Sequence, residues 1–388
     1  MANRAIILVL DGVGIGEAPD TAAYGDAGSH TLGNVAKAVG GLALPHLRHA
    51  GLGNIAPLKG MAPVDHPTAA YGLMEPKSAG KDSTTGHWEI AGVHLAQPFP
   101  TYPRGFPPEV VAEFARRTGR PVIGNVVGSG TAIIETYADE HVRTGAWILY
   151  TSADSVFQIA AHEGTIPLDE LYAGCQIARD MLVAPHDVSR VIARPFVGAP
   201  GAWKRTANRK DISIQPPAET LLDALAAAGI PRSGVGKVDD LFAGRGITSI
   251  HTPTNQDAYA LIEGGLLAMR RGLLFANVIE FDQSWGHRND VAGFQKGLLE
   301  LDRWIPRLLK QVREEDLIIF TADHGNDPTT PSTDHARECV PVLALGPRVR
   351  PVALGELGTF ADVGQTIAEF LGVRPLEAGT SFLERVWS

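Results

Sequence analysis

Four short apolar segments that each end in an acidic residue dominate the hydrophobic pattern of the chain. They are AIILVLDG, WILYTSAD, LLFANVIEFD and LIIFTADHG, whose acids are Asp11, Asp154, Asp282 and Asp323. Near-continuous apolar runs of this length are typical of strands buried on both faces, as in parallel α/β sheets. Because sites in open α/β sheets form beyond the carboxyl ends of the strands, we expect the chemistry just after these runs.

Helical patterns alternate with these runs. Residues 218–229 (AETLLDALAAAG) and residues 293–316 (GFQKGLLELDRWIPRLLKQVREED) read as helices. The alternation predicts an α/β fold with a mostly parallel central sheet flanked by helices. Proline-rich segments at residues 97–109 and 213–220 mark connections. We therefore predict a discontinuous core domain, residues 1–96 and 217–388, with a smaller domain inserted over residues 97–216.

Composition and charge exclude several classes of protein. The 388 residues are 44% hydrophobic and carry a net charge of −9, with acids and bases mixed along the chain. A nucleic-acid or acidic-membrane binder needs a basic face, so we expect neither partner. The two cysteines give no disulfide framework, and no apolar run reaches the ~18 residues of a membrane helix. We predict a cytoplasmic protein in which local cations or bound metal attract any anionic substrate.

Three aspartates and three histidines stand in loops that should follow strands. The candidate ligands are Asp11, Asp282, His287, Asp323, His324 and His335. Carboxylate and imidazole without thiolate suit Mn²⁺, Zn²⁺ or Fe²⁺. Six ligands are too many for one such ion but suit two ions ~4 Å apart, which can clamp both ends of a phosphoryl transfer. Singly, each residue has an ordinary alternative role as a turn former, a helix cap or a surface polar group.

The stretch GKDSTTGHWEIAG, residues 80–92, offers three adjacent hydroxyls before a helix-like run. A hydroxyl coordinated to a divalent cation loses its proton near neutral pH, so a nucleophile here needs no neighbouring base. Helix N-terminal N–H groups would also attract a phosphate. The alternative is a Ser or Thr N-cap, and neighbouring residues can serve both roles. The residues alone leave open which of the three hydroxyls, Ser83, Thr84 or Thr85, is the nucleophile.

The motifs resemble those of the phosphopentomutases, a family of the alkaline phosphatase superfamily, along nearly the whole chain. The most specific runs are GKDSTTGHWEIAG and YTSADSVFQIAAHE, and further runs are DGVGIGEAPD, YGDAGSHTLGN, RVIARPFVG, RTANRKD and TADHGNDPTTPSTDHARE. The resemblance implies an alkaline-phosphatase-like core with an inserted α/β cap domain. It also implies the interconversion of α-D-ribose 1-phosphate and ribose 5-phosphate, with deoxy sugars accepted, through a phosphoenzyme and a pentose 1,5-bisphosphate.

The resemblance also implies the cofactors and the metal ligands. Two Mn²⁺ ions are expected, with Zn²⁺ or another divalent ion as the alternative, and a sugar bisphosphate as activator. One ion would be held by Asp11, Asp323, His324 and the nucleophile, and the other by Asp282, His287 and His335. The family usually has its phosphorylated threonine directly after Gly-Lys-Asp, where this chain has Ser83. The resemblance therefore implies that Ser83 is the nucleophile, Thr84 a spacer and Thr85 a support or cap.

The substrate contacts follow from the same resemblance. Pentose phosphates are the expected small-molecule partners, with no obligate protein partner. Distal-phosphate and sugar contacts are predicted at Ser152, Asp154, Ile192, Arg194, Arg209 and Lys237, with Arg205 as a further candidate. Arginine suits this role because it grips phosphate through two hydrogen bonds. Two alternatives use the same residues differently: a metal-dependent phosphomonoesterase, in which water takes the phosphate, and a catalytically inactive binding protein.

Overall fold

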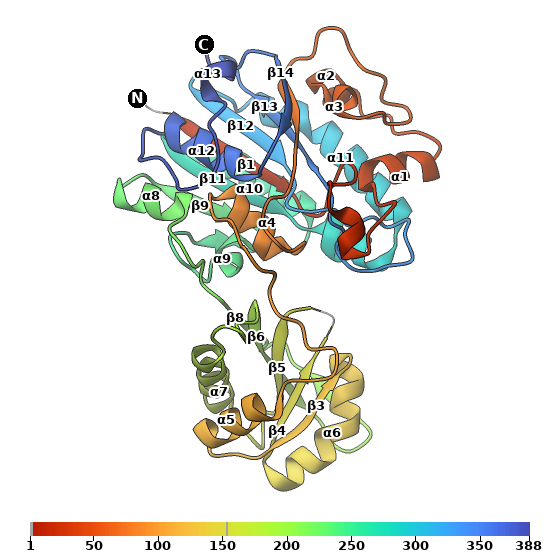
Figure 1. Ribbon diagram of the computed structural model, residues 1–388, viewed down its shortest axis with the longest axis vertical. Coiled ribbons are helices and arrows are strands. Elements are labelled where there is room, and N and C mark those ends of the chain that lie inside the picture. The colour runs from red at the N-terminus through yellow and green to blue at the C-terminus, as the bar shows by residue number, and fades with distance from the viewer. Residues whose placement is uncertain (1–2, 153) are drawn as a thin grey trace. The chain divides into compact units, whose positions relative to one another are not determined.

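The structure is a computed structural model that describes residues 3–152 and 154–388. Its chain divides into two compact units, one formed by Met1–Pro98 with Pro216–Ser388 and the other by Phe99–Gln215 (Figure 1). Both division points fall within the proline-rich segments. None of the helices in the described ranges is long and apolar enough to cross a membrane.

A mixed sheet forms the centre of the first unit. Across the described residues it has eight strands in the order β10-β9-β11-β1-β12-β13-β2-β14. Their bounds are β1 Arg4–Leu10, β2 Ala70–Met74, β9 Arg232–Val235, β10 Ser249–Ile250, β11 Gly272–Val278, β12 Asp316–Thr321, β13 Val340–Leu345 and β14 Ala353–Leu357. The neighbours from β10 to β12 run parallel, and β13 runs antiparallel to β12 and β2. The predicted α/β fold with a mostly parallel central sheet is therefore confirmed.

Helices flank this sheet and leave its central strands completely buried. Each residue of β1, β11 and β12 is buried, as their continuous apolar sequences predict. The helices are α1 Thr31–Ala38, α2 Pro45–Ala50, α3 Leu52–Ile55, α4 Ser83–Ile90, α8 Leu221–Ala227, α9 Val238–Leu241, α10 Asn255–Ala268, α11 Val291–Leu309, α12 Ala361–Phe370 and α13 Leu383–Val386. Single turns lie at η1 Thr21–Tyr24, η2 Phe281–Trp285 and η3 Gly286–Arg288.

Both predicted helices are present, but the second is shorter than its pattern. Residues 218–229 contain α8, and Thr220 caps its first turn in a capping box with Asp223. Residues 293–316 contain α11, which ends at Leu309, and Asp316 instead opens β12. The prediction was wrong for residues after Lys310 because Asp316 pairs with Arg4 of β1 in the sheet register.

The second unit is a smaller α/β layer structure. Its described strands are β3 Val122–Val127, β4 Trp147–Thr151, β5 Val156–His162, β6 Arg190–Val197, β7 Lys204–Arg205 and β8 Lys210–Ser213. Its helices are α5 Pro108–Thr118, α6 Gly130–Thr144 and α7 Leu168–Met181. Buried residues of α5 and α7 pack with Trp147 and Phe157 in one core cluster, and residues of α6 pack with Tyr150 and Phe196 in a second.

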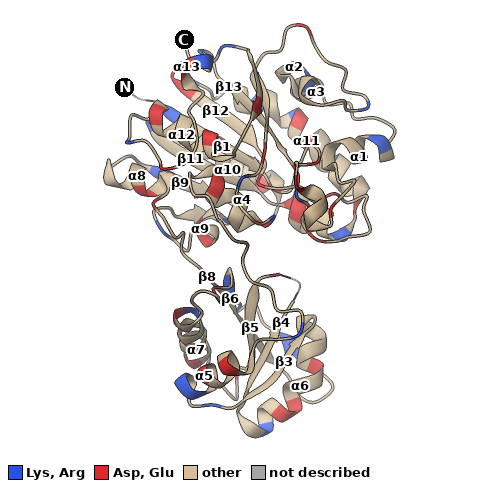
Figure 2. Cartoon of the chain, in the orientation of Figure 1, with Lys and Arg blue, Asp and Glu red and all other residues tan. Residues whose placement is uncertain are grey.

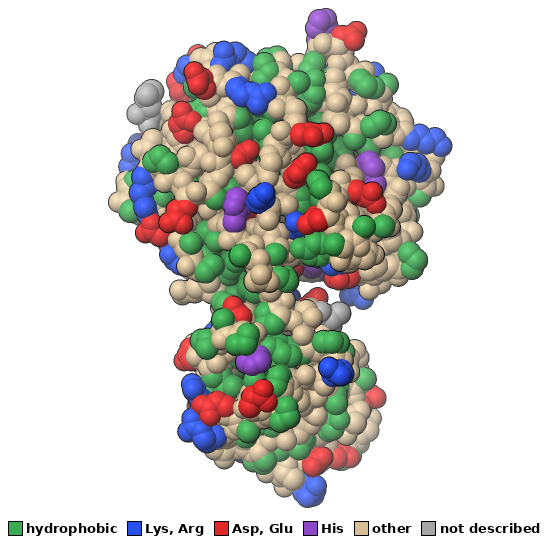
Figure 3. Space-filling model, in the orientation of Figure 1, with side chains coloured by type: hydrophobic (Ala, Val, Ile, Leu, Met, Phe, Trp, Pro, Cys, Tyr) green, Lys and Arg blue, Asp and Glu red, His purple; other side chains and the backbone are tan. Residues whose placement is uncertain are grey.

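Charges are spread over both units. Figure 2 shows Lys and Arg interspersed with Asp and Glu along each unit. The space-filling view shows the same mixture, with charged side chains scattered among hydrophobic ones on the face that it draws (Figure 3). Any strong local field must therefore come from a small group of residues.

A buried ion pair joins the first strand to the rest of the sheet. Arg4 Nε lies 2.7 Å from Asp316 Oδ1, and a second bond joins the guanidinium to Oδ2. The guanidinium also donates to the carbonyl groups of Leu266 and Gln311. Because both side chains are fully buried, each charge depends on the other for its stabilisation.

Replacing Arg4 by methionine should lower the free energy of unfolding by about 3–5 kcal/mol, because it leaves the buried Asp316 carboxylate without its counter-charge. The double variant Arg4→Met/Asp316→Leu should recover much of this loss. Urea unfolding of the three proteins measures both effects. A loss below about 1 kcal/mol in the single variant would show that the pair contributes little.

Candidate functional site

Four adjacent parallel strands bring four charged residues to one edge of the sheet. Asp11 directly follows β1, Asp282 follows β11, Asp323 follows β12 and Lys237 follows β9. The strand register pairs Leu10 with Val278, and Val9 with Thr321, so these strands end at the same level. The expectation that the chemistry lies beyond the carboxyl ends of the strands agrees with this arrangement.

Asp282 lies in the π-helical turn η2 and faces two histidines. Its Oδ2 is 3.3 Å from His287 Nε2, and its Oδ1 is 3.3 Å from His335 Nε2. Asn326 donates to Oδ1 at 2.7 Å, and His287 Nδ1 lies 2.6 Å from the Thr333 carbonyl oxygen. The contact with the Thr333 carbonyl oxygen places the hydrogen on His287 Nδ1, so Nε2 is the nitrogen that faces Asp282. This orientation is typical of metal-binding histidines.

His324 connects this trio to Asp11 and Asp323. Its Nε2 lies 3.3 Å from Asp11 Oδ1 and 3.5 Å from Asp323 Oδ2. The rings of His324 and His335 have centroids 4.2 Å apart. The six predicted ligands therefore form one group, which we call the Asp-His cluster: Asp11, Asp282, His287, Asp323, His324 and His335.

Strong negative charge makes the Asp-His cluster attractive to cations. Burial opposes ionisation of Asp282, but His335 and His287 hold the pKa of its carboxyl well below the ordinary value. Burial likewise opposes protonation of His324, but Asp323 and Asp11 raise its pKa to about 10. The pKa of His287 is raised to about 9 against its own burial, mainly by Asp282.

The donor atoms of the Asp-His cluster fit divalent cations. Ligand atoms of Asp282, His287 and His335 lie within 4.8 Å of one another, and so do those of Asp11, Asp282 and His324. Asp323 Oδ2 is buried and has no hydrogen-bond partner within the described residues, although two histidine nitrogens lie near it. A cation bound to these atoms would displace the protons that the carboxylates attract to the histidines.

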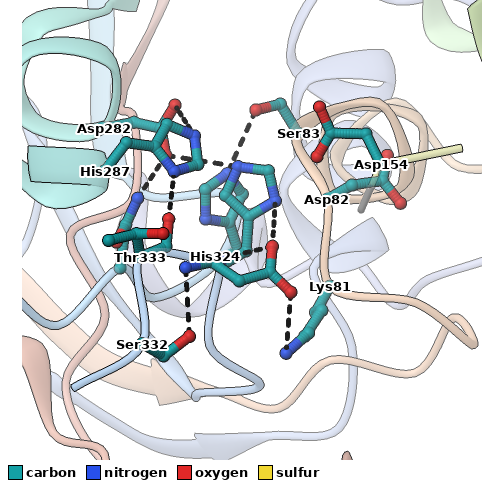
Figure 4. A network of polar contacts seen from close by, with 12 residues as sticks. Lys81, Asp82, Ser83, Asp154, Asp282, His287, His324, Ser332 and Thr333 are labelled. Atoms are coloured by element: carbon teal, nitrogen blue, oxygen red, sulfur yellow. Dashed lines mark hydrogen bonds and ion pairs between the residues drawn. The ribbon is translucent and has the colours of Figure 1, made fainter. Parts of the chain in front are cut away.

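Ser83 stands at the edge of this cluster, in the first turn of α4. Its Oγ lies 3.1 Å from His324 Nε2 and 3.3 Å from Asp11 Oδ1. Figure 4 shows the hydroxyl pointing from α4 toward His324. Helix α4 comes this close because Gly86 has no side chain: a Cβ there would lie 2.1 Å from the Asp323 carbonyl oxygen.

The helix cap is Asp82, so the prediction of Thr85 as a cap was wrong. Asp82 Oδ1 accepts a hydrogen bond from the Thr85 backbone N–H at 3.0 Å, and Oδ2 accepts one from the Thr85 hydroxyl at 2.6 Å. A carboxylate is favoured at this position because it also interacts with the positive end of the helix dipole. The Thr85 hydroxyl is thereby committed to Asp82.

Lys237 lies beside Ser83 and Asp11 in the first unit. Its Nζ is 2.8 Å from Asp11 Oδ2 and 3.4 Å from Ser83 Oγ. Burial opposes its charge, but Asp11 and Asp282 raise its pKa above the ordinary value. Gly236, with φ of +82°, makes the turn after β9 that aims the lysine here. A Cβ at Gly236 would lie 2.3 Å from the Asn277 carbonyl oxygen, so the turn requires glycine.

The other predicted substrate contacts lie in the second unit. Arg194 in β6 donates from Nε to Gln158 Oε1 at 3.1 Å, and Arg209 forms two 2.6 Å bonds with Asp211. Asp154 is half-exposed and lies 3.8 Å from Arg190. Ile192 is only 2% exposed, and Ser152 is partly exposed at the end of β4. No contact in the structure assigns these residues a ligand, so their roles stay predictions.

Tyr150 is a residue of the second unit that the sequence did not single out. Its hydroxyl is buried and has no hydrogen-bond partner in the part of the chain that the structure describes. A Cβ placed on Gly130, the first residue of α6, would lie 2.8 Å from this hydroxyl and 3.7 Å from an Arg205 nitrogen. Burial raises the pKa of Tyr150, while Arg194, Arg205 and Arg209 act to lower it. The N-terminal residue of α6 and the Arg205 guanidinium therefore lie near the Tyr150 hydroxyl.

Asn326 was also missed, although it stands in the quoted TADHGND motif. Its bond to Asp282 fixes the carboxylate between the two histidines. The nearest signal in the sequence is the position of Asn326 directly after the Asp-His-Gly run. Hydrogen bonds from neighbouring residues commonly hold metal-binding side chains in place.

Comparisons with known proteins show the family to which the chain belongs. The family model of the metalloenzyme superfamily matches residues 3–375. Phosphopentomutase of Caldanaerobacter subterraneus subsp. tengcongensis is 52% identical over 388 residues, which cover 100% of this chain and 98% of that protein. Phosphopentomutase of Anaeromyxobacter sp. (strain K) is 55% identical, with 100% of both chains covered.

A solved structure supports the fold alone. The PH0037 protein of Pyrococcus horikoshii superposes with a TM-score of 0.52 at 15% identity, covering 97% of this chain and 99% of that one. The two relatives carry the assignment, because each is more than 50% identical over the whole length of this chain. The chain belongs to the phosphopentomutase family, within the metalloenzyme superfamily.

Proposed function

We propose that the chain interconverts α-D-ribose 1-phosphate and D-ribose 5-phosphate, and the 2-deoxyribose equivalents, through phosphorylated Ser83 and a pentose 1,5-bisphosphate. Membership of the family makes the protein an isomerase that moves a phosphoryl group within a pentose phosphate. One observation carries the proposed mechanism: the Ser83 hydroxyl lies at a helix N-terminus, within 3.3 Å of both Asp11 and His324.

Membership of the metalloenzyme superfamily supports divalent metal as the cofactor. We assign one Mn²⁺ ion to Asp11, Asp323 and His324 and a second to Asp282, His287 and His335, with Zn²⁺ as the alternative metal. Oxygen and nitrogen donors without thiolate suit both metals. When bound, such ions lower the pKa of a coordinated hydroxyl and neutralise the charge of a transferring phosphoryl group.

Ser83 is the favoured nucleophile among the three hydroxyls. Its Oγ faces the Asp-His cluster, whereas the Thr85 hydroxyl donates to Asp82. Ser83 is the first residue of α4, and the backbone N–H groups at a helix N-terminus favour an anion such as a phosphate. Lys237 adds a positive charge 3.4 Å from the same oxygen, which stabilises a phosphate there.

The transfer needs Ser83 to be phosphorylated before a pentose monophosphate binds. A sugar bisphosphate, the proposed activator, supplies this phosphoryl group: Ser83 Oγ forms a bond to phosphorus, its proton leaves, and the sugar oxygen is released. A free hydroxyl of the pentose monophosphate then attacks the phosphoserine and becomes the second phosphate of the 1,5-bisphosphate. Attack of Ser83 on the other phosphate regenerates the phosphoserine and releases the isomeric monophosphate.

The second unit is proposed to recognise the anionic end of the substrate. Burial and the neighbouring Arg209 guanidinium lower the pKa of Arg194, which shows that the positive charges of this group repel one another. A phosphate would relieve this repulsion and accept a hydrogen bond from the buried Tyr150 hydroxyl. Ser152, Asp154 and Ile192 remain proposed sugar contacts on the family resemblance alone.

Replacing Ser83 by alanine should lower mutase activity by at least about 1,000-fold, because the phosphoryl acceptor is lost. Incorporated phosphate should map to Ser83 in the wild-type protein and be absent from this variant. The control Thr85→Ala should keep its phosphate, since that hydroxyl serves the helix cap. Mass spectrometry of the peptide containing residues 80–92 distinguishes these outcomes, and phosphate retained in Ser83→Ala would transfer the role to Thr84 or Thr85.

Product analysis with the wild-type protein distinguishes a mutase from a phosphomonoesterase. Phosphorus NMR of ribose 1-phosphate with activated wild-type protein should show ribose 5-phosphate without inorganic phosphate. Release of ribose and inorganic phosphate as the sole products would replace the mutase proposal by the hydrolytic alternative.

Removing a ligand from either end of the Asp-His cluster should affect one ion more than the other. His287→Ala should weaken the ion assigned to Asp282, and Asp323→Ala the other, each by more than about 100-fold, which exceeds the usual effect of outer-shell residues. Calorimetric titration of the metal-free proteins with Mn²⁺ resolves the two sites. Equal loss of both ions in each variant would contradict the division into two sites.

Arg194→Met should raise KM for ribose 5-phosphate by about 10–100-fold, because a hydrogen bond to a charged group contributes about 1.5–3 kcal/mol. Tyr150→Phe should raise KM less, since it removes one neutral donor and keeps the ring in its core. The control Arg116→Met changes an exposed arginine of α5 that pairs with Glu113. Initial rates measure KM and kcat, and an unchanged KM in Arg194→Met would remove this residue from the substrate site.

A further inference from the structure

His87 is a buried imidazole between the proposed nucleophile and a proposed metal ligand. It lies in α4 one turn after Ser83 and is fully buried. Its Nδ1 is 2.9 Å from the Ser83 carbonyl oxygen and 3.1 Å from Asp323 Oδ2. Neither the motif analysis nor the proposed function gives this residue a role.

The neighbours of the ring assign its protons. Nδ1 faces a carbonyl oxygen and a carboxylate oxygen, which both accept, so Nδ1 carries the hydrogen. On the other side Nε2 lies 3.3 Å from Asn277 Nδ2, an amide donor in β11, and therefore accepts. The ring also stacks on Phe275 of the same strand, with centroids 5.7 Å apart and planes 17° apart. These contacts hold the Nδ1–H in one direction.

The same N–H acts on two groups. Its hydrogen bond goes to the Ser83 carbonyl, whereas the contact with Asp323 Oδ2 is close but lies outside hydrogen-bond geometry. The other carboxylate oxygen, Asp323 Oδ1, accepts from the Gly12 backbone N–H at 3.1 Å. The loop after β1 therefore holds Asp323 Oδ1 in place. The buried Oδ2 of the same carboxylate faces the Nδ1–H of His87 and the ring of His324.

We propose that His87 is a positioning residue that sets the spacing between Ser83 and Asp323. Its Nδ1–H donates to the Ser83 carbonyl oxygen and lies 3.1 Å from Asp323 Oδ2, so one imidazole contacts both the backbone of the nucleophile and a carboxylate oxygen that would hold the first proposed ion. This inference rests on the proposed metal assignment. If His87 only fills space against Phe275, phenylalanine at this position should leave the affinity for both ions unchanged.

The test compares replacements that keep different parts of the imidazole. His87→Phe keeps the ring and its stacking but loses the N–H. His87→Asn places an amide N–H near the position of Nδ1, and His87→Gln places one nearer to Nε2. The matched control is His141→Phe, because His141 is a fully buried histidine of the second unit that also contacts backbone groups on both ring nitrogens.

We expect His87→Phe to weaken the ion assigned to Asp11, Asp323 and His324 by about 10–100-fold, the effect typical of second-shell residues, and to leave the other ion unchanged. His87→Asn should lose less affinity than His87→Gln. His141→Phe should bind both ions as the wild-type protein does. Calorimetric titration of the metal-free proteins with Mn²⁺ measures the affinities, and thermal unfolding in chelator measures stability separately.

Two results would overturn the role of His87. One is wild-type affinity for both ions in His87→Phe, and the other is an equal loss of both ions that follows a loss of stability. If His87→Phe does not fold, equal affinities in His87→Asn and His87→Gln overturn it. The variant Asp323→Ala distinguishes failure of the positioning role from failure of the metal assignment. If Asp323→Ala binds both ions, the metal assignment itself is wrong. If Asp323→Ala loses one ion while His87→Phe binds both, only the positioning role is wrong.

Discussion

The convergence of several carboxylates at the ends of neighbouring parallel strands is the constraint on which the site depends. Asp11, Asp282 and Asp323 follow β1, β11 and β12, which lie side by side in the sheet. Buried carboxylates this close repel one another unless positive charge is supplied. Histidines, Lys237 and, in the proposed function, divalent ions supply it. The Asp-His cluster is therefore both a destabilising element of the fold and the source of its chemistry.

Close packing of α4 brings Ser83, the proposed nucleophile, to this charged cluster. The helix approaches Asp323 at Gly86, where no side chain intervenes, and the first turn then places Ser83 beside His324. Asp82 caps the turn and occupies the Thr85 hydroxyl, which leaves Ser83 as the hydroxyl directed at the cluster. His87 contacts the carboxylate of Asp323, and Asn326 donates a hydrogen bond to that of Asp282.

A few residues supply the positive charge that an anionic substrate requires. A net charge of −9 would repel an anionic substrate, and Figure 2 shows no segregation of basic residues that would reverse this over a whole unit. Positive charge is instead concentrated at Lys237 in the first unit and at Arg194, Arg205 and Arg209 in the second. Partial burial makes the charges of Lys237 and Arg194 more effective than they would be in water.

The sequence by itself determined the elements and the ligand types. Continuous apolar runs ending in Asp predict buried strands, and the motifs name the six proposed ligands and Ser83, because both signals are local along the chain. Tertiary structure alone decided which strands are neighbours, and therefore that Lys237, after the short strand β9, joins Asp11 and Ser83. It also decided that Asp316 leaves the helical pattern to pair with Arg4. His87 and Tyr150 gave no signal because their roles depend on contacts with residues distant in sequence, which a one-dimensional pattern does not contain.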